Sequence, residues 1–188
     1  MNKKYREAIE DFPVIAGIRT ENDLNECLKT DCQNIFILYG NILNIGDITR
    51  RISEAGKYAY VHMDMIEGIS SKEIAVEFIK EHTSAVGIIS TKSALIKRAK
   101  ELDLFAIQRF FILDSLALKN IKKQMEQTRP DFIEILPGLM PRVISDLKKE
   151  VGQKVIAGGL ISRKEDILDA LNAGATAIST TNSELWYM

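Results

Sequence analysis

Short apolar segments alternate with longer amphipathic segments along nearly the whole chain. Most of the short segments are apolar at both odd and even positions, as in parallel strands that are covered by helices outside and packed within. Strands are predicted at residues 13–19, 35–39, within 58–66, 85–90, 105–112, 131–136, 154–157 and 175–178. Regular strand–helix alternation of this kind predicts a parallel sheet.

The segments between these strands have the length, polarity and end signals of helices. Ser162 with Glu165 three residues later predicts a capping box, and Gly174 follows the same helix at the expected C′ position. Helices are predicted at residues 21–28, 47–55, 70–81, 91–101, 114–128, 141–152 and 162–172, with a lead-in helix at 1–12 and a short helix after residue 182.

Eight strand–helix units predict an α/β fold, a single (β/α)8 barrel of the TIM type over residues 1–188. An open, doubly wound sheet is the alternative, and a pair of anion-binding loops after the last two strands favours the barrel. The chain of 188 residues is shorter than the usual barrel of about 200 residues or more. We therefore expect short helices and trimmed loops.

Two neighbouring strand ends carry groups that suit an anion. A glycine pair lets backbone N–H groups approach a ligand, and a helix N-terminus adds further donors. The predicted phosphate-binding residues are Gly158, Gly159, Ser179, Thr180, Thr181 and Asn182. An ordinary β-α-β unit whose glycines only ease packing is the alternative, but the hydroxyl cluster favours phosphate binding.

Polar residues in otherwise apolar strands point to the mouth of the predicted barrel. Outward side chains lie under helices, where an unpaired polar group is costly, so polar residues should face inward. The rule selects Arg19, His62, Asp64, Thr91, Lys92, Gln108, Arg109 and Glu134. His62 and Asp64 are two apart and should share one strand face. Gln108 and Arg109 should lie on opposite faces unless a bulge intervenes.

Each of these residues also has a purely structural interpretation. His62 could be a satisfied core histidine, Arg19 and Glu134 could form an internal ion pair, and Lys92 could be solvated in a helix's first turn. Taken together, polar groups at five strand ends around an anion site indicate a small, polar, phosphorylated ligand.

Several enzyme classes lack their residues. No lysine lies inside a predicted strand to form a Schiff base, and His82 falls at the end of a helix, away from the mouth. Asp64, Glu134 and His62 could hold a divalent metal, which keeps a phosphodiesterase or a sugar-phosphate isomerase open.

Composition adds few constraints. Hydrophobic residues make up 46% and charged residues 27% of the chain, which is ordinary for a globular protein. Cys27 and Cys32 form no disulfide framework, no signal peptide is visible and no apolar run could span a membrane, so we expect a cytoplasmic protein. The net charge is −1, but residues 90–130 hold nine Lys/Arg and four Asp/Glu.

At these same positions the sequence resembles a known family, the glycerol uptake operon antiterminators. The matching segments are PVIAGIR at 13–19, VHMDMIEGI at 61–69, GIISTKS at 87–93, AIQRFFILDS at 106–115, DFIEILPG at 131–138, AGGLI at 157–161 and AISTTNSELW at 177–186. The resemblance implies a (β/α)8 barrel that binds glycerol 3-phosphate and then the leader mRNA of glycerol-utilisation genes, without a cofactor or catalysis.

The same resemblance assigns residues to the two ends of the ligand. It implies that Gly158, Gly159 and residues 179–181 take the phosphate, and that Asp64, Gln108 and Glu134 hold the glycerol hydroxyls. An enzyme on the same barrel and a metabolite-binding regulator without RNA binding remain as alternatives, and the oligomeric state, including a homo-oligomer, is open.

The basic band supplies a candidate RNA surface. Helices after consecutive strands are neighbours on a barrel. The cations of the helices that follow the fourth and fifth strands could therefore share one face. These are Lys97, Arg98 and Lys100, with Lys119, Lys122 and Lys123. Backbone phosphates would be attracted there. The alternative is that these side chains are simply solvated.

Overall fold

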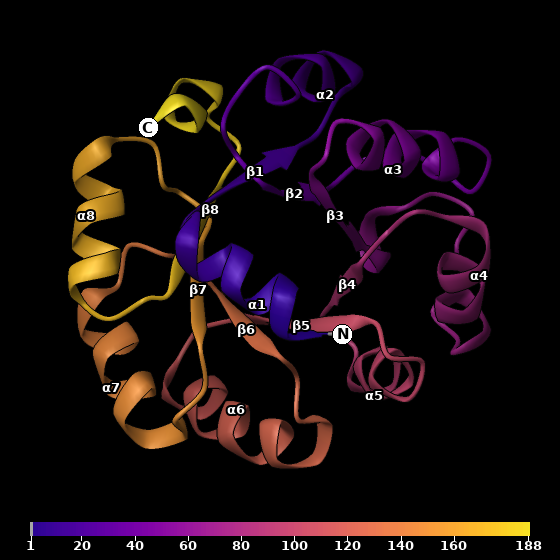
Figure 1. Cartoon of the computed structure of the whole chain (residues 1–188). Helices are drawn as coiled ribbons and strands as arrows, with labels where there is room; N and C mark the ends of the chain where they lie inside the picture. The colour runs from indigo at the N-terminus through magenta and orange to yellow at the C-terminus, as the bar shows by residue number, and fades with distance from the viewer. Residues whose placement is uncertain (1) are drawn as a thin grey trace.

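A computed structural model describes residues 2–188 and shows a closed barrel of eight parallel strands (Figure 1). The strands pair in chain order, and β8 closes the barrel against β1. They are β1 (Val14–Ile18), β2 (Asn34–Ile37), β3 (Tyr58–His62), β4 (Gly87–Ser90), β5 (Phe105–Phe111), β6 (Phe132–Leu136), β7 (Val155–Gly158) and β8 (Ala177–Thr180). The predicted (β/α)8 fold is confirmed.

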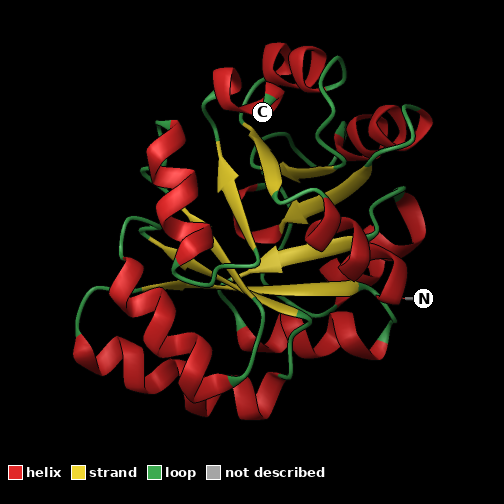
Figure 2. Ribbon diagram, turned by 60° about the vertical axis from the view of Figure 1, so that its left-hand side comes forward, coloured by secondary structure: helices red, strands yellow, loops and turns green. Residues whose placement is uncertain are grey.

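Helices surround the barrel, as Figure 2 shows. They are α1 (Asn2–Asp11), α2 (Glu21–Cys27), α3 (Ile45–Glu54), α4 (Ile74–His82), α5 (Ser93–Glu101), α6 (Ser115–Thr128), α7 (Pro141–Val151) and α8 (Lys164–Asn172), with 3₁₀ helices η1 (Met63–Met65) and η2 (Ser183–Tyr187). The helices that follow strands have only 7 to 14 residues, so a short chain completes the barrel by trimming its helices.

The barrel interior is filled by large side chains and plugged at one end by α1. Phe36, Tyr60, Phe105 and Phe132 are fully buried in one apolar cluster. Ile9 of α1 belongs to the same cluster, and α1 lies across the barrel in Figure 1. The lead-in helix therefore covers the N-terminal ends of the strands, and the C-terminal mouth of the barrel stays open.

The structure corrects several predicted boundaries. The last strand begins at Ala177, two residues late, because the N–H of Ala175 still bonds to Ala170 at the end of α8. Ser179 therefore lies within the strand. Asp64 lies in η1 rather than on β3, so it does not share a strand face with His62.

Two predicted helix starts are also wrong. Helix α8 begins at Lys164, and the carboxylate of Asp166, not Glu165, accepts from the N–H groups of Ser162 and Arg163. Helix α4 begins at Ile74 without a serine cap. Within residues 2–188, no helix is both long enough and apolar enough to cross a membrane.

Candidate functional site

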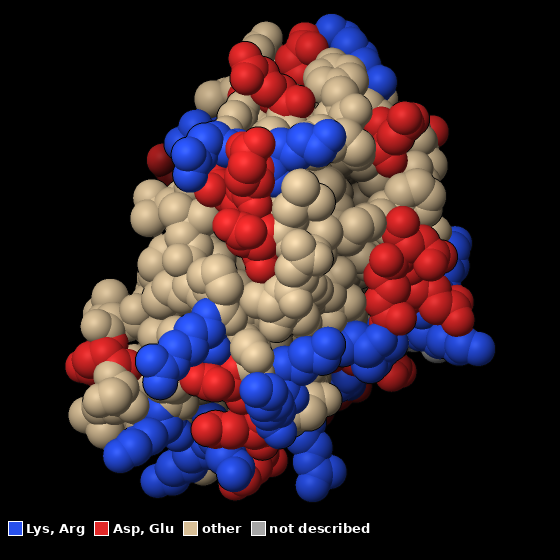
Figure 3. Space-filling model, turned by 90° about the vertical axis from the view of Figure 1, so that its left-hand side faces the viewer, with Lys and Arg blue, Asp and Glu red and all other residues tan. Residues whose placement is uncertain are grey.

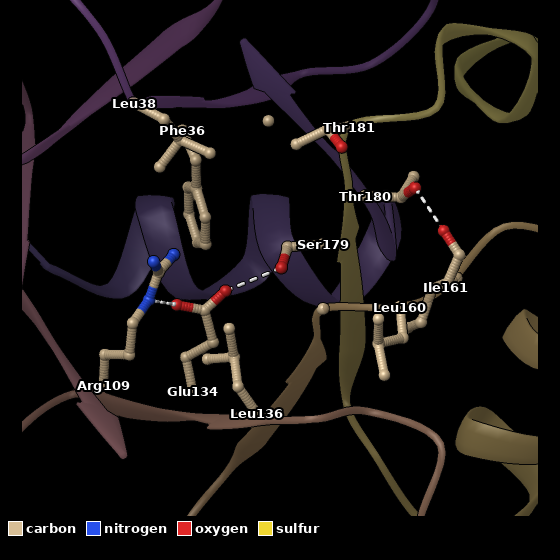
Figure 4. A pocket seen from close by; sticks show the side chains of 12 residues that line it. Phe36, Leu38, Arg109, Glu134, Leu136, Leu160, Ile161, Ser179, Thr180 and Thr181 are labelled. Atoms are coloured by element: carbon tan, nitrogen blue, oxygen red, sulfur yellow. Dashed lines mark hydrogen bonds and ion pairs between the residues drawn. The ribbon is translucent and has the colours of Figure 1, made fainter. Parts of the chain in front are cut away.

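A cavity of about 110 Å³ opens at the C-terminal mouth of the barrel (Figure 4). It is built from the ends of five strands and the loop between β7 and α8. Its lining consists of Gly17, Phe36, Leu38, Arg109, Glu134, Leu136, Gly159, Leu160, Ile161, Ser179, Thr180 and Thr181. Phe36, Leu38 and Leu136 make one wall apolar, and the polar side chains come from β5, β6 and the end of β8.

A buried charged pair forms the floor of this cavity. The Nε of Arg109 donates to Oε2 of Glu134 at 2.6 Å, and the hydroxyl of Ser179 donates to Oε1 of Glu134 at 2.6 Å. Glu134 is fully buried and Arg109 nearly so. The terminal nitrogens of Arg109 point toward the cavity in Figure 4, where they could bind an oxygen of a ligand.

Gly158 makes this arrangement sterically feasible. A Cβ at this position would lie 2.5 Å from the hydroxyl oxygen of Ser179 and 2.6 Å from Oε1 of Glu134. Any larger residue would displace one of them. Gly158 therefore shapes the polar floor, whereas the sequence suggested contact with phosphate.

The loop after β7 presents free backbone donors. Gly159 and Leu160 have positive φ angles of 74° and 62°. Within the described residues, no hydrogen bond leaves the N–H groups of Gly159, Leu160 or Ile161. Consecutive N–H groups around left-handed residues form concavities that bind anions. Thr181 lies on the facing side of the cavity in Figure 4.

Two residues of the predicted phosphate set are held in other contacts. The hydroxyl of Thr180 donates to the carbonyl of Ile161 at 2.8 Å and braces the loop after β7. Asn182 caps η2 through Glu184 N–H and donates to the carbonyl of Ser162. Their side chains position the loops around the cavity.

His62 ends β3, and its Nδ1 lies 4.0 Å from Oδ2 of Asp64. It is 3% exposed, and neither ring nitrogen has a hydrogen-bond partner among the described residues. Burial, and then the charge of Arg109, lower its pKa to about 4, while Asp64 opposes the shift. His62 is therefore neutral near pH 7, with unused hydrogen-bonding capacity.

Asp64 holds the loop between β4 and α5. Its carboxylate accepts from the N–H of Thr91 at 2.8 Å and from the hydroxyls of Thr91 and Ser90, and Lys92 lies 3.5 Å away. Burial raises the pKa of Asp64, but the bonds from Thr91 and the nearby His62 outweigh burial and leave it below the usual range.

Comparison with known proteins identifies the family. The model of the glycerol-3-phosphate responsive antiterminators matches residues 14–186. The chain belongs to this family. It is 47% identical over 174 residues to the uncharacterized protein YgcP of Escherichia coli K12, covering 93% of this chain and 91% of that one.

Solved structures agree with this assignment. The glycerol uptake operon antiterminator regulatory protein of Listeria monocytogenes is 29% identical, with a TM-score of 0.89 over 92% of this chain and 94% of its own. A related protein of Thermotoga maritima is 33% identical, with a TM-score of 0.83 over 93% and 98%. A deoxyribose phosphate aldolase of Aeropyrum pernix, 14% identical over 97% and 89% with a TM-score of 0.70, shows the fold alone.

In this family member, Arg109 and Glu134 of the predicted pocket residues line the cavity. The others are not part of its lining: Arg19, His62, Asp64, Thr91, Lys92 and Gln108. Gln108 points outward, where it bonds to Ser93 of α5 and to Gln124 and Thr128 of α6. The expectation that it faces the mouth is wrong, because polar residues of the helices satisfy it. Arg19 is exposed beyond β1, so the internal pair of Glu134 is formed by Arg109 instead.

The candidate metal ligands are also dispersed. Asp64 is bound to the loop after β4, and Glu134 to Arg109 and Ser179. The residues that the structure describes contain no group of three His, Cys, Asp or Glu placed to hold a metal.

The apolar wall and the backbone donors were not predicted from the sequence. Phe36 and Leu38 of the second strand looked like ordinary core, and Leu160 and Ile161 contribute N–H groups that no side chain reveals. In the sequence, the glycine pair was the only signal of these backbone donors.

Proposed function

We propose that this chain is a glycerol-3-phosphate-responsive antiterminator that binds the ligand in the mouth cavity. The phosphate would occupy the concavity of free N–H groups at residues 159–161 beside Thr181. The glycerol hydroxyls would face Glu134 and the terminal nitrogens of Arg109. The ligand-bound protein would then bind the leader mRNA of glycerol-utilisation genes and prevent termination.

The observation that carries the ligand assignment is the pairing of two complementary ends within one small cavity. Unpaired backbone donors at residues 159–161 suit an anion, and a carboxylate beside a guanidinium suits hydroxyl groups, which both donate and accept. Membership of the antiterminator family supports the same ligand and supports RNA as the second partner. A regulatory role, rather than an enzymatic one, agrees with that family.

Calorimetric titration with glycerol 3-phosphate, glycerol and inorganic phosphate tests the ligand. We expect glycerol 3-phosphate to bind at least tenfold more tightly than either fragment, because only it fills both ends. Thr181→Val, which removes one hydroxyl at the phosphate end, should weaken binding about fivefold to tenfold. Equal affinity for glycerol and its phosphate would refute the assignment.

Thr176→Val is the matched control for this variant. Thr176 precedes the same strand, β8, at the closed end of the barrel. The two substitutions have the same chemistry, so the difference in their affinities isolates the position. If both reduce binding equally, the effect is on the fold and not on the site.

A further inference from the structure

Two cations of the predicted RNA surface on α5 and α6 are held in ion pairs. Arg98 of α5 is bonded to Glu77 of α4 at 2.8 Å and to Glu101 at 2.7 Å, and Lys100 pairs with Asp131 at 2.7 Å. These two cations are already neutralised by partners. On α5, only Lys97 is exposed and without an ion pair among the described residues.

Helix α6 differs in this respect. Lys119, Lys122, Lys123 and Arg129 are exposed, and none has an ion-pair partner within the described residues. Residues 115–129, which form the helix and its C-cap, contain a single acidic residue, Glu126. We call these four cations the α6 basic face.

Two cations of the neighbouring helix α7 (Pro141–Val151), Lys148 and Arg142, do not extend this surface. Lys148 of α7 lies over Gly174 at the end of α8, where a Cβ would be 2.7 Å from its Cδ, so it turns away from α6. Arg142 lies 3.9 Å from Asp146. In Figure 3, Lys and Arg gather at the lower edge, the part of the molecule where Figure 1 places α6 and α7.

There is room for a ligand beside the α6 basic face. A cleft of about 470 Å³ runs between the ends of α6 and α7, lined by Lys122, Arg129, Glu126 and Glu150 among others. Lys122 and Arg129 line this cleft together with two carboxylates, whereas Lys119 and Lys123 lie outside it and supply the positive excess. From residue 119 to residue 129 a helix rises about 15 Å, enough to follow several phosphates of a nucleic-acid strand.

We propose that the α6 basic face binds the phosphate backbone of RNA, an inference that rests on the proposed antiterminator function. Its place in the fold connects it to the cavity. Arg109 lies on β5, the strand that leads into α6, and Asp114 caps α6 by accepting from the N–H of Ala117 at 2.7 Å. A ligand that contacts Arg109 thus acts on the strand from which the RNA-binding helix departs.

The test is fluorescence anisotropy with a labelled, mixed-sequence RNA of thirty nucleotides, with and without glycerol 3-phosphate. Four phosphate contacts predict a slope of log K against log salt of about −3. Lys122→Glu with Lys123→Glu should weaken RNA binding at least tenfold and reduce that slope by about 1.4. Affinity for glycerol 3-phosphate should not change.

The control variant is Lys80→Glu with Lys164→Glu. These lysines are exposed on α4 and α8, without ion pairs among the described residues, and their reversal changes the net charge equally. We expect less than a threefold effect on RNA binding. An equal loss in both double variants would show that only net charge matters and would overturn the assignment.

Further outcomes separate this surface from the function on which it rests. RNA binding that persists in the Lys122/Lys123 variant refutes the α6 basic face and leaves the antiterminator function standing. Absence of RNA binding in the native protein refutes both. Binding of anionic phosphatidylglycerol vesicles but not of RNA would make the face a membrane-docking surface and overturn the proposal.

Discussion

Arg109 and Glu134 form an ion pair of 2.6 Å between neighbouring strands, buried at the open end of the barrel. The register of β5 and β6 places the two residues directly opposite each other. Opposite charges held in low dielectric interact strongly, but each has given up its hydration. The pair is therefore sensitive to the loss of either member.

Arg109→Met should destabilise the protein by about 3–5 kcal/mol, because it leaves the buried carboxylate of Glu134 uncompensated. The double variant Arg109→Met with Glu134→Gln should be more stable than this single variant, since the unpaired charge is gone. Urea unfolding of the two single variants and the double variant measures the coupling. Strictly additive effects would show that the pair does not interact.

Gly158→Ala should lower both stability and ligand affinity. Its Cβ would lie 2.5 Å from the hydroxyl oxygen of Ser179, and such overpacking costs about 1–3 kcal/mol. Gly17→Ala is the matched control, because its Cβ would meet Thr181 only at 3.2 Å. Thermal unfolding should rank the control closer to the native protein; it is a control for stability alone, because Gly17 also lines the cavity. The opposite order would contradict the steric role of Gly158.

The barrel could be predicted from the sequence because the signals for its strands and for its helix ends are both local. Apolar runs on both parities mark covered strands, and end signals such as Asp114 and Gly152 mark helix limits. The rule that polar strand residues face inward holds for Arg109 and Glu134, whose side chains line the cavity at the mouth. His62 is buried but does not line that cavity.

The same rule failed where a helix supplies polar partners. Gln108 faces outward because Ser93, Gln124 and Thr128 satisfy its amide, and that pairing depends on how α5 and α6 pack. The periodicity of apolar and polar residues along the chain does not indicate such a contact between elements. The free N–H groups at residues 159–161 could not be predicted from the sequence either, because they depend on the left-handed φ of Leu160.

Gln108→Leu tests this reassignment. It leaves the hydroxyls of Ser93 and Thr128 with fewer partners, so we expect a loss of about 1–3 kcal/mol in stability. Affinity for glycerol 3-phosphate should stay within about twofold, since the side chain of Gln108 points away from the barrel interior. Weaker ligand binding at unchanged stability would return Gln108 to the pocket.

The last prediction concerns pH and His62. The pKa of a histidine in an unfolded chain is about 6.5, whereas burial and then Arg109 lower that of His62 to about 4. Between these values the unfolded chain binds a proton that the native protein does not. Stability is therefore complete above about pH 6.5 and falls as the pH drops toward 4, by about 3 kcal/mol from this group alone.

His62→Gln should remove that component. Other groups titrate in both proteins, so the difference in unfolding free energy between native protein and variant should shrink by about 3 kcal/mol from pH 7 to pH 4. Urea unfolding at half-unit pH steps measures it, with His82→Gln at the exposed end of α4 as the histidine-removal control. If the native and His62→Gln curves run parallel, His62 titrates normally and is not desolvated at the mouth of the barrel.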